Sequence, residues 1–126
     1  EDIKTRERII SDFYYEWKRS NPTQRLFNID LKDYINIRHI SIIETVEHAA
    51  RTYLSTLAVL QLDSILTMAK KVRIVNVKPK DKNQNQFEKM IKMEYDLVGI
   101  GKVSLIVGVK RSNKEKVQYC ITAIKT

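Results

Sequence analysis

The chain has little of several features that would point to a particular class of protein. Its 126 residues include 3 glycines, 2 prolines and 1 cysteine. With Cys120 as the only cysteine, an internal disulfide or a cysteine-rich zinc site cannot form. So few glycines and prolines argue against long structureless segments. We therefore expect a folded domain in a reducing compartment, with the cytoplasm as the default.

Long apolar runs and targeting signals are also missing. The longest apolar runs are as short as residues 57–60, whereas a membrane-spanning helix needs about 20 apolar residues. No signal peptide is visible, because the chain opens with Glu1-Asp2 and no apolar segment follows. We expect no membrane association. Because the first residue is not Met, we also expect the chain to be either trimmed at its start or a fragment of a longer protein.

Positive charge is in excess. The chain has 23 Lys and Arg residues against 15 Asp and Glu residues, which gives a net charge of +8 and a pI near 9.6. A basic domain attracts polyanions, so RNA or another polyanion is the expected partner. The alternative is a basic surface without a specific partner. The sequence contains no run of five or six like charges, so no basic tail marks a binding segment.

The first half of the chain has helical periodicity. An apolar stripe predicts a helix over residues 1–20, which Pro22 ends because proline cannot continue the hydrogen-bond ladder. Residues 25–38 are harder to interpret and allow a short strand, a turn and one helical turn. Ser41-Ile42-Ile43-Glu44 has the spacing of a capping box, which predicts the start of the main helices at residues 41–71. Asp63 is placed to cap a short second helix within that range.

The periodicity then changes to alternation. Residues 72–124 predict four strands, and their short connections favour antiparallel neighbours in sequence order. The expected fold is therefore a single α+β domain over residues 1–126, with N-terminal helices packed on a four-stranded antiparallel meander sheet. The residues expected to form the core between helices and strands are Ile43, Val46, Ala50, Tyr53, Leu54, Leu57, Ile91, Met93, Leu105, Val107 and Ile121.

Few residues are suited to catalysis. The three glycines do not form a phosphate loop, and two histidines without a cysteine or carboxylate at ligand spacing do not form a zinc site, so we expect no metal and no cofactor. RNA cleavage without metal needs an acid, a base and cations, and histidine suits the first two roles. The candidate catalytic residues are His39, His48 and Thr122, and the candidate nucleic-acid-binding residues are Arg38, Arg51 and Lys110. The alternative for His48 is an ordinary solvated residue on the helix surface, and for His39 a residue flanking the helix N-terminus that makes a local hydrogen bond.

The order of the elements is similar to that of a known superfamily. An entry histidine, a helix, the short helix Leu62-Asp63-Ser64-Ile65-Leu66 and a meander ending in Tyr119-Cys120-Ile121-Thr122-Ala123-Ile124 resemble the phage- and mobile-element-associated branch of the barnase–EndoU–colicin–RelE-like nucleases. Members of this branch are often part of large polyvalent proteins. The resemblance covers about residues 36–124, and it implies metal-independent RNA cleavage. It also implies that His39 or His48 is the helix histidine, Thr122 the polar residue of the last strand and Lys110 a strand cation.

Two functions follow from these observations. The first is a basic RNA-engaging domain that acts as a metal-independent endoribonuclease from a mobile genetic element. The second is a non-catalytic accessory module of a larger protein, which binds nucleic acid or protein. A nuclease should gather a histidine, a cation and a hydroxyl in one cleft, whereas a binding module should spread basic residues over an exposed face.

Overall fold

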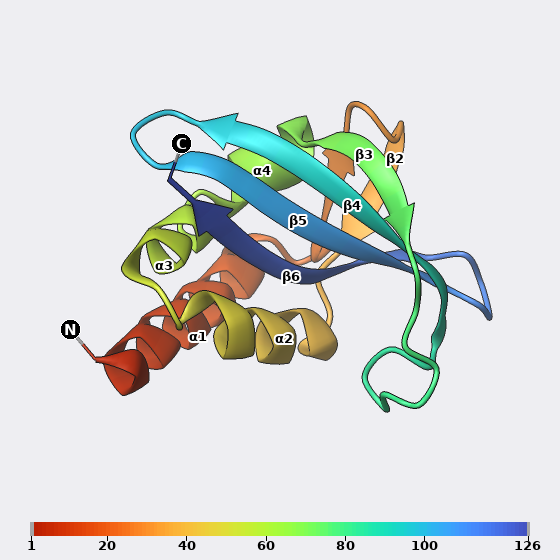
Figure 1. Ribbon diagram of the computed structural model, residues 1–126, viewed down its shortest axis with the longest axis horizontal. Helices are drawn as coiled ribbons and strands as arrows, with labels where there is room; N and C mark the ends of the chain where they lie inside the picture. The colour runs from red at the N-terminus through yellow and green to blue at the C-terminus, as the bar shows by residue number, and fades with distance from the viewer. Residues whose placement is uncertain (1, 126) are drawn as a thin grey trace.

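The computed structural model describes residues 2–125 and has an α+β fold, with helices gathered behind and below a single curled sheet (Figure 1). The helices are α1 (Ile3–Ser20), α2 (His39–Ala49), α3 (Tyr53–Val59) and α4 (Leu62–Met68). The strands are β1 (Arg25–Asn28), β2 (Asp33–Asn36), β3 (Lys70–Val75), β4 (Phe87–Leu97), β5 (Gly101–Lys110) and β6 (Lys116–Ile124). No helix among the described residues is long and apolar enough to cross a membrane.

Over the described residues, the sheet has six strands in the order β1-β2-β6-β5-β4-β3. Strands β3 to β6 are antiparallel neighbours in sequence order, as the alternation predicted. The prediction of a four-stranded, wholly antiparallel sheet is nevertheless wrong. Residues 25–36 form a further hairpin, and its strand β2 runs parallel to β6 through the pair Asn36 and Val117. Two strands of four residues each are too short for their alternation to stand out, and their partner lies about 80 positions away.

Helix α1 begins and ends close to the predicted positions. Asp2 caps it, because its Oδ1 accepts a hydrogen bond from the Thr5 amide at 2.8 Å. Ile10, Tyr14 and Trp17 are buried, at the spacing of one helical face. After the last turn the chain leaves the helix toward Pro22, which cannot continue it.

The main helical region is three helices, and the two predicted caps within it are wrong. Helix α2 starts at His39, two residues before the predicted cap, so Ser41 lies in its first turn. The Ser41 hydroxyl accepts the Arg38 amide at 3.0 Å. Asp63 does not cap α4 either, because its Oδ1 accepts a hydrogen bond from Trp17 Nε1 at 2.6 Å.

The helical path is interrupted between α2 and α3, because side chains satisfy the backbone groups there. The Thr52 hydroxyl accepts the Ser55 amide at 3.1 Å and so starts α3. The Thr56 hydroxyl lies 3.2 Å from the Ala49 carbonyl and donates to it at the end of α2. A continuous apolar stripe could not reveal this break, since helical periodicity persists on both sides of it.

The core lies between the helices and the inner face of the sheet. All five predicted strand residues are buried there: Ile91, Met93, Leu105, Val107 and Ile121. The helix side of the prediction is partly wrong, because Ile43 and Tyr53 are exposed by 43% and 57%. The break after α2 turns α3 to a new direction, so one stripe cannot describe both helices. Ala50 is buried, while Val46, Leu54 and Leu57 are half-buried.

Helices α2 and α3 cover the edge of β6 beyond the point where β2 leaves it. The Ser55 hydroxyl accepts the Ala123 amide at 2.9 Å and donates to the Ala123 carbonyl at 3.3 Å, which satisfies backbone groups that a neighbouring strand would otherwise pair. Helix α2 therefore lies beside β6, with one side toward the core and another toward the outer face of the sheet. Its outer stripe carries the candidate functional site.

Candidate functional site

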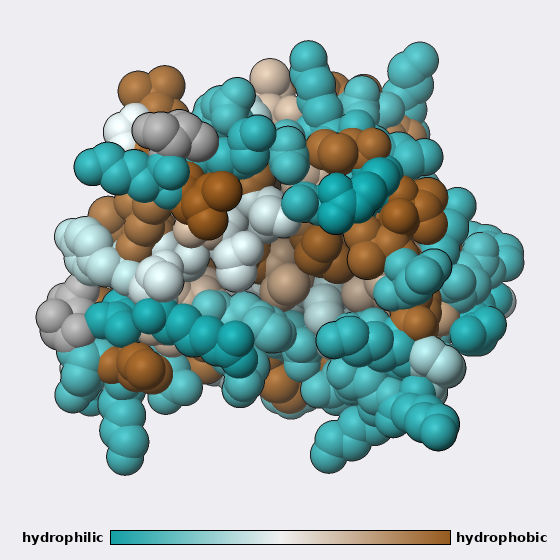
Figure 2. All heavy atoms as spheres, viewed as in Figure 1, coloured by the Kyte–Doolittle hydropathy of each residue, from teal (hydrophilic) through white to brown (hydrophobic). Residues whose placement is uncertain are grey.

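The outer face of strands β4, β5 and β6 carries two neighbouring rows of side chains. One row contains Lys92, Ile106 and Cys120, and the next contains Glu94, Ser104 and Thr122. Each row joins directly paired residues, whose side chains point to the same side of a sheet, and the two rows are about 7 Å apart along the strands. Figure 2 shows this side of the molecule, where teal side chains surround a hollowed centre of pale and brown ones.

A hollow of about 200 Å³, here called the sheet cleft, lies over the first of these rows. Its floor consists of Met90, Ile106 and Cys120. The α2 helix forms one side, and the segment after β3, with Lys78 and Gln84, forms another. The sheet cleft thus has an apolar floor and polar rims, a combination typical of small-molecule and base-binding sites.

His48 lies at the α2 rim of the sheet cleft. Its Nε2 is 3.4 Å from Oε1 of Glu44, one turn earlier on the same helix, and the Glu44 side chain is only 9% exposed. The other Glu44 oxygen accepts a hydrogen bond from Asn83 Nδ2 at 2.8 Å. A buried carboxylate held in this way can fix the orientation of the imidazole at the rim of the cleft.

The Tyr119 hydroxyl and the Cys120 thiol of the sheet cleft remain protonated at neutral pH. Burial, together with the nearby Glu44 carboxylate, raises the pKa of Tyr119 well above its usual value. Burial also raises the pKa of Cys120 to about 12, with the Glu44 charge adding to the effect. A thiol attacks only as a thiolate, so Cys120 is not suited to act as a nucleophile.

A second hollow of about 260 Å³ lies over the neighbouring row. Oε2 of Glu94 is 3.7 Å from Lys92 Nζ, and its Oε1 is 3.6 Å from Lys102 Nζ. The hydroxyl-bearing residues Ser104 and Thr122 occupy the same row as Glu94 and line the same hollow. This hollow, here called the lysine hollow, brings together two ammonium groups, two hydroxyls and a carboxylate. Such a set can bind an oxyanion and accept a proton.

The outer face has an excess of positive charge. Lys70 is paired with Glu94 across β3 and β4, and Arg73 is paired with Lys92, so both extend the rows described above. With Lys102, and with Lys78 at the rim of the sheet cleft, the face carries more cations than carboxylates. This balance favours an anionic ligand.

The predicted catalytic residues do not all come together. His48 and Thr122 lie on the outer face, in adjoining hollows. His39 is exposed at the first position of α2, and nine residues of helix place it about 13 Å from His48 along the axis. His39 therefore does not share a hollow with His48.

The predicted nucleic-acid-binding cations are each paired with a carboxylate. Arg38 makes a two-pronged ion pair with Glu115, at 2.6 and 3.2 Å, and Lys110 lies 3.7 Å from the same side chain. Sequence reasoning did not anticipate that these two cations would meet. Arg51 pairs with Glu47 at 3.1 Å, where both side chains are well exposed.

Sequence reasoning missed the residues Glu44, Lys92, Glu94, Lys102 and Ser104. Two signals were available. Glu44 precedes His48 by four residues, which places both on one helical face. Lys92 and Glu94 alternate with the buried residues Ile91 and Met93, which assigns them to the opposite face of the sheet. The strand register was needed to show that Ser104 and Lys102 lie opposite or beside Glu94 on the neighbouring strand.

Within residues 2–125, no group of three or more His, Cys, Asp and Glu side chains is placed to hold a metal ion. No known protein family, curated protein or solved structure matches this chain. The resemblance to the barnase–EndoU–colicin–RelE-like nucleases therefore stays a prediction from the sequence.

Proposed function

We propose that this domain engages RNA on the outer face of β4, β5 and β6 and cleaves it without a metal ion. The observation that carries the proposal is the position of His48. The buried Glu44 carboxylate holds the His48 side chain at the edge of the sheet cleft. The sheet cleft adjoins the lysine hollow, which has two lysines and two hydroxyls. The resemblance noted in the sequence supports the same class of reaction, together with an origin in a mobile genetic element and a larger parent protein.

Electrostatic attraction accounts for the engagement of RNA. The ammonium groups of Lys92 and Lys102 lie beside one another around Glu94 and suit a phosphodiester, with the hydroxyls of Ser104 and Thr122 as further donors. A phosphate in the lysine hollow places the adjoining base over the apolar floor of the sheet cleft. The amide of Gln84, at the rim, is suited to the polar edge of that base.

The cleavage reaction proposed here is attack of the ribose 2′-hydroxyl oxygen on phosphorus. The new oxygen–phosphorus bond forms a 2′,3′-cyclic phosphate, and the bond to the 5′-oxygen of the next nucleotide breaks. Glu94 accepts the proton of the 2′-hydroxyl, and the protonated imidazole of His48 gives a proton to the leaving 5′-oxygen. The two lysines stabilise the charge that develops on the phosphoryl oxygens.

One observation favours the alternative of binding without cleavage. Both carboxylate oxygens of Glu94 face lysine ammonium groups, at 3.6 and 3.7 Å, so a ribose hydroxyl would compete with these lysines for the carboxylate. In this second candidate function, the outer face is a basic surface that holds RNA as part of an accessory module. His48 then contributes a hydrogen bond and no proton transfer.

The test is incubation of the purified protein with labelled RNA in an excess of chelator. We expect cleavage that ends in a 2′,3′-cyclic phosphate. The substitutions His48→Gln and Glu94→Gln should each slow it by about 100-fold or more, which is typical for the loss of a general acid or base. His39→Gln is the matched control, because that imidazole lies outside both hollows and the variant should keep full activity.

Three results would revise this proposal. RNA that binds but stays intact, with and without chelator, supports the binding module. Cleavage that survives His48→Gln but not His39→Gln moves the site to the start of α2. RNA that does not bind even at low salt contradicts both candidate functions.

A further inference from the structure

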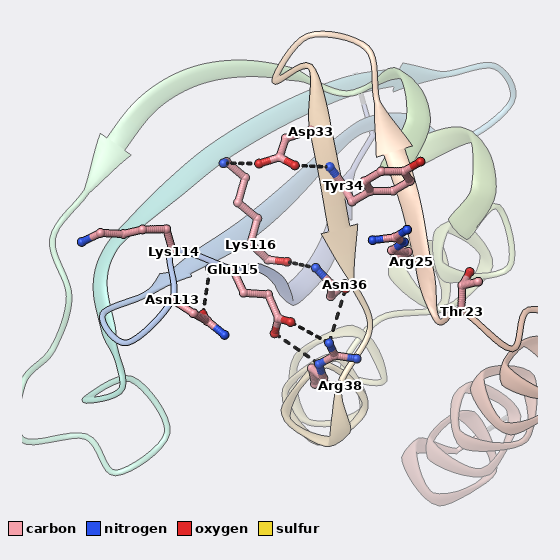
Figure 3. A pocket seen from close by; sticks show the side chains of 10 residues that line it. All are labelled: Thr23, Arg25, Asp33, Tyr34, Asn36, Arg38, Asn113, Lys114, Glu115 and Lys116. Atoms are coloured by element: carbon pink, nitrogen blue, oxygen red, sulfur yellow. Dashed lines mark hydrogen bonds and ion pairs between the residues drawn. The ribbon is translucent and has the colours of Figure 1, made fainter.

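A separate groove of about 470 Å³ lies between the β1–β2 hairpin and the start of β6. Figure 3 shows Arg25 on one side of strand β2, Glu115 and Lys116 on the other side, and Arg38 below the end of that strand. These residues come from segments far apart in the chain, so the groove exists only where the hairpin meets β6. We call it the hairpin groove. Neither hollow of the outer face shares a residue with it.

The two carboxylates of the hairpin groove are already neutralised. Asp33 Oδ2 lies 2.7 Å from Lys116 Nζ, and this hydrogen bond lowers the pKa of Asp33. Glu115 is held by both prongs of Arg38 and by Lys110, and these contacts lower the pKa of Glu115. Both carboxylates are therefore ionised at neutral pH and have no need of a further cation.

Arg25 differs from Arg38 and Lys116, because its guanidinium contacts an aromatic ring and not a carboxylate. Its guanidinium carbon lies 3.9 Å from the centre of the Tyr34 ring, in a cation–π stack. Phe27 packs edge-on against the same ring, with 5.4 Å between ring centres, and supports it. No carboxylate among residues 2–125 forms an ion pair with Arg25. The stack holds the guanidinium flat, so its N–H donors are directed outward around its edge in the fixed fork that suits oxyanions.

The charge balance identifies the ligand. Four cations (Arg25, Arg38, Lys110 and Lys116) surround two carboxylates, so two positive charges are in excess. Lys114 also lines the groove but does not add to this excess, because its ammonium group pairs with Glu88. A phosphate monoester carries a charge of about −1.5 to −2 at neutral pH, together with three acceptor oxygens.

We propose that the hairpin groove binds a phosphate group, with Arg25 as its principal ligand and with Arg38 and Lys116 facing it. The group can come from free phosphate or a mononucleotide, or from the 5′-phosphate end of a polynucleotide, and the chemistry of recognition is the same. This site is independent of RNA cleavage on the outer face.

The test is an NMR titration of the ¹⁵N-labelled protein with inorganic phosphate at constant ionic strength. We expect saturable shifts of backbone amides confined to residues 23–38 and 110–116. Arg25→Gln should weaken the affinity by about tenfold, because a charge-assisted hydrogen bond is lost. Arg25→Lys should recover only part of the affinity, since it restores the charge but not the planar fork. Arg8→Gln is the matched control, an exposed arginine on α1, and should bind phosphate as the wild type does.

Further ligands in the same experiment identify the kind of ligand. Acetate should bind at least about fivefold more weakly than phosphate, because acetate carries less negative charge and can accept fewer charge-assisted hydrogen bonds. A dinucleotide with a 5′-phosphate that shifts the same amides, when its 5′-hydroxyl counterpart does not, identifies a polynucleotide end as a source. If only phosphate and mononucleotides bind, the source is a small molecule.

Three outcomes would overturn the proposal. The first is shifts that rise linearly with phosphate and are spread over the whole surface. The second is equal affinity of the wild type and Arg25→Gln. The third is equal affinity for acetate and phosphate. None of these depends on RNA binding or cleavage, so the result does not depend on whether the domain is a nuclease.

Discussion

The Tyr14 hydroxyl on α1 donates a 2.6 Å hydrogen bond to Oε1 of Gln118 on β6, 104 positions further along the chain. Gln118 Nε2 in turn donates to the Thr45 hydroxyl on α2 at 2.8 Å. All three side chains are buried. This small polar network joins the first helix, the helix that carries His48 and the central part of β6.

Removal of the Tyr14 hydroxyl should therefore destabilise the fold. In Tyr14→Phe, Oε1 of Gln118 loses its donor in a place that water does not reach. We expect a loss of about 1–3 kcal/mol in the free energy of unfolding, measured by urea denaturation. Tyr15→Phe is the matched control, because Tyr15 is 49% exposed, and its stability should be unchanged. A Tyr14→Phe protein as stable as the wild type would contradict the network.

Truncation of the core should have a larger effect. Leu105 on β5 is fully buried between the sheet and the helices, so Leu105→Ala leaves a cavity and should cost about 2–5 kcal/mol in the free energy of unfolding. Val98→Ala, in the turn before β5, should cost less than about 0.5 kcal/mol, because Val98 is 98% exposed. Similar losses at the two positions would contradict the burial of Leu105 or the exposure of Val98.

The ion pair of Arg38 with Glu115 should make stability depend on pH. The pKa of Glu115 is lowered below its ordinary value of 4.5, chiefly by the hydrogen bond from Arg38. A lowered pKa in the folded state gives stability that is present above the ordinary value and is lost as pH falls through the folded value. Wild type should therefore exceed Arg38→Gln in stability at about pH 6, and the difference should narrow toward about pH 3. A difference that is constant over this range would show that Arg38 stabilises by packing and not by charge.

The Cys120 thiol should react slowly in the folded protein. Burial raises its pKa to about 12, so hardly any thiolate is present near neutral pH. We expect alkylation by iodoacetamide to be at least about tenfold slower in buffer than in urea, where the thiol has its usual pKa of about 8.5. Cys120→Ser should keep the RNA activity of the wild type. Loss of cleavage in a folded Cys120→Ser protein would give the thiol a role that its protonation argues against.

RNA binding on the outer face should depend steeply on salt. Each phosphate contact to a single strand contributes about 0.7 to the slope of log affinity against log salt concentration, because a counterion is released. Lys92→Gln and Lys102→Gln should each reduce the magnitude of that slope by about 0.7, as measured by fluorescence anisotropy with a labelled oligonucleotide. Lys4→Gln, an exposed position on α1, should leave the slope unchanged. A slope that Lys4→Gln lowers as much as the other two would indicate diffuse attraction without a defined face.

Much of the fold follows from local pattern in the sequence. The helix that ends before Pro22 and the four strands after residue 70 were predicted because each depends on neighbours within a few positions. Thr122 and His48 were named as candidates from the sequence, and they line the two hollows of the outer face, but their catalytic role stays a prediction. The α+β class is confirmed, and the placement of Leu105 and Ile121 in the core follows from simple alternation.

The tertiary structure decided what depends on residues far apart in the chain. The β1–β2 hairpin joins the sheet through Asn36 and Val117, a pairing that no local pattern encodes. The sequence shows that Arg38 and Lys110 are cations, but only the fold brings both to Glu115 and leaves Arg25 stacked on Tyr34. Periodicity assigns a side chain to one face of its own helix or strand. The side chains that it contacts on other elements depend on the strand register and on where a helix ends. Both are determined by the packing of the whole domain.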